Sequence, residues 1–126
     1  MKIKISELTG AQLNWAVAEC EGKVEQGVYG TPELLESGLH LHYCDVLLSH
    51  PYNPSTDWAQ GGTLIQREGI GIRQYGDFLE SHWQADKWAF KFVDPMATGP
   101  TPLIAAMRVY VMAKHGNEIN IPEELL

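Results

Sequence analysis

Residues 99–116 read GPTPLIAAMRVYVMAKHG, and this stretch decides which fold class the chain is expected to adopt. Thr101 stands directly before Pro102, the order in which a helix N-cap precedes proline at the first helical position. Gly116 follows where a glycine typically ends a helix. The stretch therefore predicts a helix from about Pro102 to His115.

This helix is expected to be apolar on two opposite faces. One face carries Leu103, Ile104, Met107, Tyr110 and Val111, and the other carries Ala105, Val109 and Met112. A helix at a protein surface keeps a polar face, so this one has to be covered on both sides. The sequence does not decide what buries the second face. The helix lies inside the domain, or its second face contacts another copy of the chain in a homodimer.

The rest of the chain predicts a second principal helix and several short strands. Thr9 and Gln12 fit a capping box at the start of a helix that runs to about Gly22. Alternating apolar residues predict the strands, and a proline after threonine predicts one helical turn. The strands are expected at residues 2–5, 39–44, 70–72, 87–92 and 118–121, and the turn at residues 31–35.

Length and composition fit one domain that folds unaided. The chain has 126 residues, of which 44% are hydrophobic and 20% are charged, and these are ordinary values for a globular protein. A chain of this length forms one hydrophobic core. We predict a single domain over residues 1–126 with an α+β fold. It consists of a small, mostly antiparallel sheet and two principal helices, the C-terminal one buried on both sides.

Charge and hydropathy disfavour several classes of partner. Sixteen acidic and nine basic side chains give a formal net charge of -7, which repels a phosphate backbone and disfavours nucleic acid. Apolar runs are much shorter than the roughly 20 residues that span a bilayer. Residues 1–6 alternate charge with isoleucine and so lack the apolar region of a secretory signal. We expect no membrane partner and a location in the cytoplasm.

The turn-rich loop that leads to Gly61 and Gly62 is the first candidate binding site. Tyr52 and Trp58 are placed to clamp a flat ligand, with Asp57 accepting its hydrogen bonds. Gly61 and Gly62 would let the backbone approach that ligand closely. A structural role explains the same residues. In that case Asp57 caps a short helix that the two glycines interrupt, and Trp58 fills the core.

The start of the C-terminal helix is the second candidate site. Free backbone N–H groups near Thr101 and the positive end of the helix dipole favour an anion there. Arg108 lies two turns further on, and its side chain leans back toward the helix start, so a phosphate or carboxylate would sit between the two. The structural alternative is that Arg108, the only charge in an apolar stretch, pairs with a buried Asp or Glu.

A third group, His40, His42 and Cys44, occupies alternate positions of one predicted strand. Imidazole and thiolate ligands suit zinc, but zinc sites usually draw ligands from a second element, and same-face neighbours on a strand are about 7 Å apart. Solvent-facing histidines and a small buried cysteine are the more common explanation of such a group. We therefore predict no metal and no cofactor, with these three residues as the alternative metal ligands.

Catalytic motifs give little support for an enzyme. The sequence contains no GxSxG, P-loop, HExxH or paired CxxC motif. Its carboxylates and histidines permit acid–base chemistry, as they do in almost any protein. The sequence leaves the question of catalysis open, leans against it, and offers no catalytic residue.

Several motifs resemble those of a known family. They are SELTG at residues 6–10, YNPSTDWAQGG at 52–62, GPTPLIAAMR at 99–108 and IPEEL at 121–125. Together they resemble the NinX-like proteins of tailed phages and prophages in enteric bacteria. The resemblance implies a phage accessory protein in the cytoplasm of a host cell, and it implies no particular reaction.

Two hypotheses about function follow. In the first, the loop and the start of the C-terminal helix converge on one cleft that binds a small, anionic or nucleotide-like molecule. In the second, the chain binds a host or phage protein through exposed aromatic side chains, with Trp83 and Trp88 as anchors. A concave aromatic pocket would favour the first hypothesis, and a flat apolar patch would favour the second.

Overall fold

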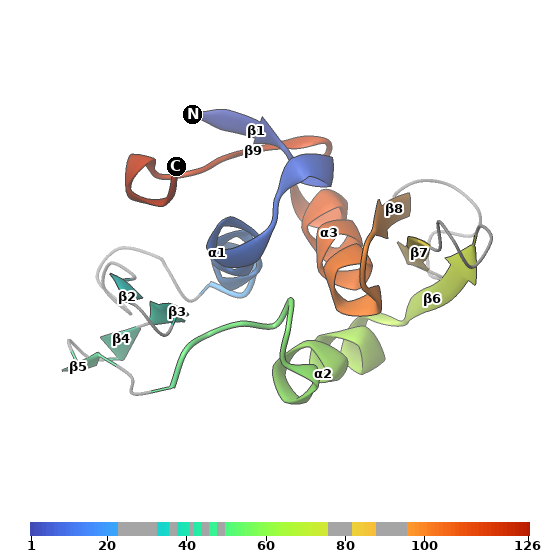
Figure 1. Cartoon of the computed structure of the whole chain (residues 1–126), viewed down its shortest axis with the longest axis horizontal. Coiled ribbons are helices and arrows are strands. Elements are labelled where there is room, and N and C mark those ends of the chain that lie inside the picture. Colours follow the sequence, from blue (N-terminus) through green and yellow to red (C-terminus); the bar gives the residue numbers. More distant parts are fainter. Residues whose placement is uncertain are drawn as a thin grey trace.

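The computed structural model describes residues 1–22, 33–35, 38–40, 42–43, 46–47, 50–75, 82–87 and 96–126. Three α-helices lie in this part of the chain: α1 (Gly10–Cys20), α2 (Trp58–Glu68) and α3 (Pro102–His115). Two short 3₁₀ helices, η1 (Ile5–Glu7) and η3 (Glu123–Leu125), lie near the chain ends. Together with short antiparallel strands they form the predicted α+β fold, which is confirmed (Figure 1).

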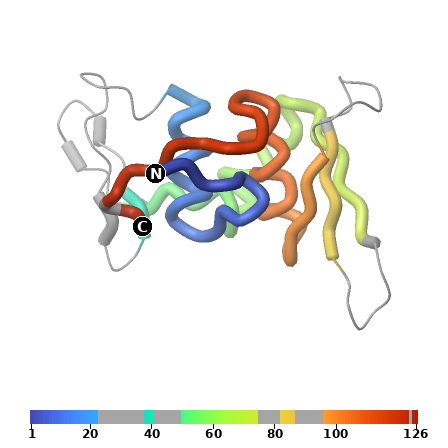
Figure 2. The backbone as a smooth tube through the Cα atoms, turned by 90° about the horizontal axis from the view of Figure 1, so that it is seen from above, coloured from blue at the N-terminus to red at the C-terminus, as the bar shows by residue number. Residues whose placement is uncertain are grey.

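The largest sheet contains three antiparallel strands, with the middle strand β7 (His82–Lys87) between β6 (Ile70–Tyr75) and β8 (Met96–Gly99). Its register pairs Ala85 with Ile72 on one side and with Ala97 on the other. The other strands form antiparallel pairs: β1 (Lys2–Lys4) with β9 (Glu118–Asn120), β2 (Glu33–Leu35) with β3 (Gly38–His40), and β4 (His42–Tyr43) with β5 (Val46–Leu47). The pairing of β1 with β9 brings both ends of the chain to one side of the molecule (Figure 2).

Helix α3 lies in the middle of the molecule. The three-stranded sheet covers one side of it, α1 packs against the opposite side, and α2 lies beside its start (Figure 1, Figure 2). Met107 and Tyr110 on one face and Ala105 and Val109 on the other are buried. The prediction of a helix buried on both sides is confirmed. Because one chain covers both faces, α3 gives no reason to expect a homodimer.

Local sequence sets both ends of α3. The Thr101 side chain accepts a hydrogen bond from the Ile104 backbone N–H at 3.2 Å, which satisfies one of the free donors of the first turn. Pro102 occupies the first turn, where the missing N–H costs nothing. Gly116 follows the last turn with a positive φ of 81°, which is unfavourable for other residues. The predicted bounds of this helix are confirmed.

Helix α2 is continuous, whereas the sequence predicts a helical segment that the two glycines interrupt. Asp57 caps it as expected, since its carboxylate accepts a hydrogen bond from the Ala59 backbone N–H at 2.9 Å. The helix then continues through Gly61 and Gly62 without the expected interruption, and it ends at Gly69 in the left-handed conformation. Tertiary contact at Gly61 explains why a weak helix former is tolerated there.

Strand pairing and a contact with the chain end overturn three local predictions. The Thr9 side chain makes no hydrogen bond to the start of α1. The Gln12 side-chain amide donates instead to the Leu125 carbonyl oxygen at 2.9 Å, so the prediction of a capping box is wrong. Residues 33–35 form β2 and not a helical turn, because β3 pairs with them. Of the strand predicted over residues 39–44, Leu39 and His40 belong to β3 and His42 and Tyr43 belong to β4, and these two strands have different partners.

Some predictions reach beyond the part of the chain that the structure describes. Lys87 ends β7, and the remainder of the strand predicted over residues 87–92 lies outside the described residues. Among the helices of the described part, none is long and apolar enough to cross a membrane.

The two glycines in α2 provide a matched test of the packing between α2, the preceding loop and α3. A Cβ at Gly61 would overlap the Pro54 carbonyl oxygen and lie 2.7 Å from Leu103 Cδ2, whereas a Cβ at Gly62 would meet only Trp58 Cε3, at 3.9 Å. Gly61→Ala should therefore lower the free energy of unfolding by about 1–3 kcal/mol. Gly62→Ala should raise it by up to about 1 kcal/mol, because alanine favours helix.

Urea denaturation of both variants measures the difference. Effects of the same sign and size would contradict the close approach at Gly61.

Candidate functional site

A pocket of about 210 Å³ lies between the start of α2 and the start of α3. Its walls come from the loop before α2, from the first residue of α2, and from the first turn of α3. The lining residues are Ser55, Thr56, Trp58, Thr101, Pro102, Leu103 and Ile104. The loop and the helix start that the sequence marks as two separate candidate sites therefore meet in one pocket.

Trp58 is the dominant side chain of this pocket. It is the first residue of α2, and it is 56% exposed although it is a large apolar residue. Trp58 therefore does not fill the core, and the structural role considered for it is wrong. An indole held at the mouth of a pocket by a capped helix is a rigid surface for stacking.

Most polar groups around the pocket already have structural partners. The Asp57 carboxylate caps α2 and does not line the pocket. The Ser55 hydroxyl is buried and donates to the Asn14 side-chain oxygen at 2.7 Å. The Thr101 hydroxyl oxygen accepts from Ile104 N–H, which leaves its proton for donation to a ligand. Thr101 is thus the polar residue best suited to contact a bound molecule.

Tyr52, Gly61 and Gly62 lie close to this region in the sequence but do not line the pocket. Tyr52 is partly buried against the core, and burial raises the pKa of its hydroxyl. Gly61 allows α2 to approach the loop carbonyl of Pro54, and so the close backbone approach that glycine permits serves packing.

Arg108 does not reach the pocket either. It is buried, with 8% of its surface exposed, and its guanidinium donates to two backbone carbonyl oxygens: Nε to Leu8 at 3.1 Å and Nη1 to Thr98 at 2.8 Å. Burial lowers the pKa of the Arg108 guanidinium, which still remains protonated at neutral pH. Among the described residues no Asp or Glu pairs with Arg108, and the backbone carbonyls of Leu8, just after η1, and of Thr98 on β8 are its partners instead.

The contacts of Arg108 predict a structural effect of its removal. Arg108→Ala should lower the free energy of unfolding by about 2–4 kcal/mol, because two buried carbonyls lose a charged donor and the aliphatic stem leaves a gap. Arg73→Ala is the matched control, since the Arg73 side chain is 64% exposed and lies 3.5 Å from Asp86; it should change stability by less than about 1 kcal/mol.

Chemical denaturation of the two arginine variants checks the prediction. Equal stability of Arg108→Ala and wild type would show that the buried hydrogen bonds do not form.

Only some of the possible metal ligands that the sequence suggests, His40, His42 and Cys44, lie within the described residues. His40 is buried at the end of β3 and is therefore not solvent-facing. His42 belongs to β4, whereas its side chain and Cys44 lie outside the described residues. A different trio, Glu19, Cys20 and His115, comes together in the described part of the chain, with ligand atoms within 4.8 Å of one another.

The aromatic anchors considered for a protein partner do not form a described surface. Trp83 lies on β7, is partly buried and packs against the hydrophobic core. Trp88 lies outside the described residues. The exposed large apolar side chains within the described residues include Trp58 and Met96, at 56% and 49%.

Sequence reasoning missed the apolar floor of the pocket and the trio at Glu19. Pro102, Leu103 and Ile104 look like ordinary core residues of an amphipathic helix, and only the position of Trp58 shows that they face a pocket. Glu19 and His115 are far apart in the sequence and carry no motif, so nothing local connects them.

Comparison with known proteins places the chain in a family. Residues 4–114 match the protein family described as "Bacteriophage P22, NinX", and this range includes all three helices except the last residue of α3. Comparison with curated protein sequences finds no significant match. The family match covers every residue that lines the pocket. The chain therefore belongs to the NinX family of phage proteins.

Proposed function

We propose that this phage accessory protein is a non-catalytic binder of a small molecule, and that its ligand occupies the pocket between the starts of α2 and α3. The observation that carries the proposal is the half-exposed Trp58 forming one wall of a concave pocket. Full burial of a large apolar side chain is worth about 1.5–3 kcal/mol, so leaving roughly half of Trp58 in solvent forgoes roughly half of that free energy. A ligand that covers the indole recovers that free energy.

The size of the pocket limits what enters it. Whole drug-sized ligands occupy roughly 300–1,000 Å³, whereas this pocket offers about 210 Å³. A single planar ring fits between the indole of Trp58 and the aliphatic residues of α3, and the rest of the ligand lies outside. The hydroxyl of Thr101 is placed to donate a hydrogen bond to a ring acceptor or to an attached group.

The electrostatics at the pocket favour an anionic group on the ligand. Helix α3 begins at the pocket behind the uncharged cap Thr101, and the positive end of its dipole attracts negative charge, whereas the Asp57 carboxylate already offsets the positive end of α2. The net charge of -7 opposes this, but salt screens distant charges beyond about 8 Å. A nucleotide-like molecule combines a ring with an anion, so this is the ligand class that we propose.

The lining of the pocket supports binding and not acid–base catalysis. Among the described residues that line it there is no Asp, Glu, His, Cys, Lys or Arg. Ser55 is the strongest potential nucleophile, but its hydroxyl is committed to Asn14 and not to a general base. We propose that the protein acts in the host cytoplasm by holding its ligand.

A protein partner is the second candidate, and the exposure of Trp58 is the observation that favours it. Exposed tryptophans are frequent anchors of protein interfaces. One apolar side chain of a partner would fill the same pocket as a ring. The two candidate functions therefore use the same residues. They differ in the molecule that co-purifies with the protein from the cell, a small compound in the first and a protein in the second.

The test is to purify the folded protein from phage-infected host cells, denature it, and identify released compounds by mass spectrometry. Wild type should release a compound that is absent from Trp58→Ala, and Trp58→Phe should retain part of it. The isolated compound should bind Trp58→Ala about 5- to 150-fold more weakly, which corresponds to about 1–3 kcal/mol of stacking. Isothermal titration calorimetry measures that ratio.

Met96→Ala is the matched control, because Met96 is also a large exposed apolar residue but lies on β8 and does not line the pocket. It should release the same compound as wild type. Equal release from Trp58→Ala would refute the pocket as the binding site. No compound from wild type, together with a co-purified protein that Trp58→Ala loses, would establish the second candidate instead.

A further inference from the structure

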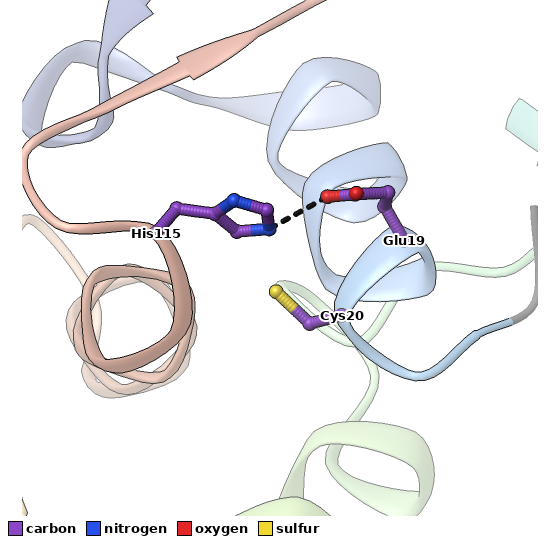
Figure 3. Close-up of side chains that lie close together, drawn as sticks. All are labelled: Glu19, Cys20 and His115. Carbon is purple, nitrogen blue, oxygen red and sulfur yellow. Dashed lines mark ion pairs between the residues drawn. The ribbon is translucent and has the colours of Figure 1, made fainter.

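The last turns of α1 and α3 bring three side chains with metal-ligand chemistry together. Glu19 and Cys20 are the final residues of α1, and His115 is the final residue of α3 (Figure 3). Their ligand atoms, a carboxylate oxygen, a thiol sulfur and an imidazole nitrogen, lie within 4.8 Å of one another. These residues lie outside the pocket described above.

The interaction between Glu19 and His115 leaves one atom unsatisfied. His115 Nε2 lies 2.7 Å from Glu19 Oε2, a distance suited to an ion pair. Yet Glu19 Oε2 is buried and has no hydrogen-bond donor of acceptable geometry among the described residues. A buried carboxylate oxygen without a donor is costly. The ion pair at the end of α3 therefore accounts for the proximity of the two residues and gives this oxygen a charged neighbour, but it does not give it a well-aligned hydrogen bond.

We propose that Glu19, Cys20 and His115 form a binding site for a divalent transition metal, with Zn²⁺ as the ion that their chemistry fits best. Thiolate, imidazole and carboxylate are the three protein ligands of zinc, and zinc sites with three protein ligands keep a fourth position for water or another ligand. The three ligands come from two different helices, α1 and α3. Zinc sites usually need ligands from more than one strand or helix, and this trio meets that requirement.

The geometry needs only a small adjustment. Zinc bonds of about 2.0–2.3 Å in a tetrahedron put ligand atoms about 3.3–3.6 Å apart. The largest separation of the three atoms is within 4.8 Å, and the shortest measured one is 2.7 Å, so shifts of about 1 Å suffice. Adjacent side chains on a helix point about 100° apart. The side chain of Glu19 is longer than that of Cys20, so its carboxylate reaches the same side of α1 as the Cys20 thiol (Figure 3).

The surroundings also favour a cation. Both helices end here, and the negative ends of their dipoles stabilise positive charge. The Cys20 thiol would bind the metal as the thiolate, because a coordinating thiol is deprotonated outright.

Metal binding would join the ends of two helices that pack against each other. A ligand that binds only the folded chain stabilises it, so Zn²⁺ should raise the melting temperature of the protein. This effect does not depend on the small-molecule pocket, and the proposal therefore stands or falls independently of the function proposed above.

Co²⁺ is the spectroscopic probe for the site, because a bound thiolate gives it an intense near-ultraviolet charge-transfer band. Reduced, metal-free full-length protein should develop this band at one equivalent of Co²⁺, and Zn²⁺ should displace the Co²⁺. Cys20→Ser should lose the band, whereas Cys44→Ser, the control at the other cysteine of the chain, should keep it. Loss in Cys44→Ser with retention in Cys20→Ser would overturn the proposal, as would no band in wild type.

The other two ligands are tested by affinity for Zn²⁺ in competition with Co²⁺. His115→Ala and Glu19→Gln should each weaken binding by at least about 100-fold, since even residues that only support metal ligands typically contribute 10–100-fold. His50→Ala is the matched control, because His50 is exposed and outside the trio, and it should bind as wild type does. Circular dichroism without metal verifies that each variant folds, and unchanged affinity in folded His115→Ala would refute the site.

Discussion

A helix that is apolar on two faces has to be buried by other elements on both sides. The arrangement of this chain follows from the elements that bury the two faces of α3. The three-stranded sheet lies on one side, and α1 packs on the opposite side (Figure 2). Covering both faces leaves only the ends of α3 near the surface. The first turn meets the start of α2 and forms the pocket, while the last turn meets the end of α1 and brings His115 to Cys20. Both candidate sites are therefore consequences of one packing requirement.

One carboxylate joins the three helices where they meet. Glu21, just past the end of α1, accepts hydrogen bonds from Arg67 of α2 at 2.9 and 2.6 Å, and another from the Tyr110 hydroxyl of α3. Tyr110 is buried, and burial raises the pKa of its hydroxyl, so losing its partner there would cost about 1–3 kcal/mol. The Arg67–Glu21 ion pair is bidentate, and the Glu21 side chain is only 14% exposed, so this pair is stronger than an ordinary surface ion pair. The ion pair and the hydrogen bond from Tyr110 together hold the three helices at this carboxylate.

The sequence predicts what neighbouring residues decide and fails where distant segments decide. Thr101, Pro102 and Gly116 determine the ends of α3 locally, and those ends are confirmed. Gln12 fits a capping box equally well by local rules, but the Leu125 carbonyl competes for its amide from the other end of the chain. Arg108 needs buried acceptors, and the sequence cannot show that two carbonyls would provide them. The candidate site was predictable only in part: Asp57 and Thr101 mark the two helix starts locally, whereas the exposure of Trp58 depends on packing that no local signal shows.

The dipole of α3 gives its two ends opposite preferences for charge. Its first turn favours an anion, which suits the ligand class proposed for the pocket, and its last turn favours a cation, which suits a metal at Glu19, Cys20 and His115. The 14 residues of α3 separate these ends by roughly 20 Å. Salt screens exposed charges beyond about 8 Å, so an ion at one end exerts little direct force on an ion at the other. Any coupling between the two sites would have to pass through the packing of α3, and a helix buried on both sides resists such movement because close-packed cores tolerate little change in shape.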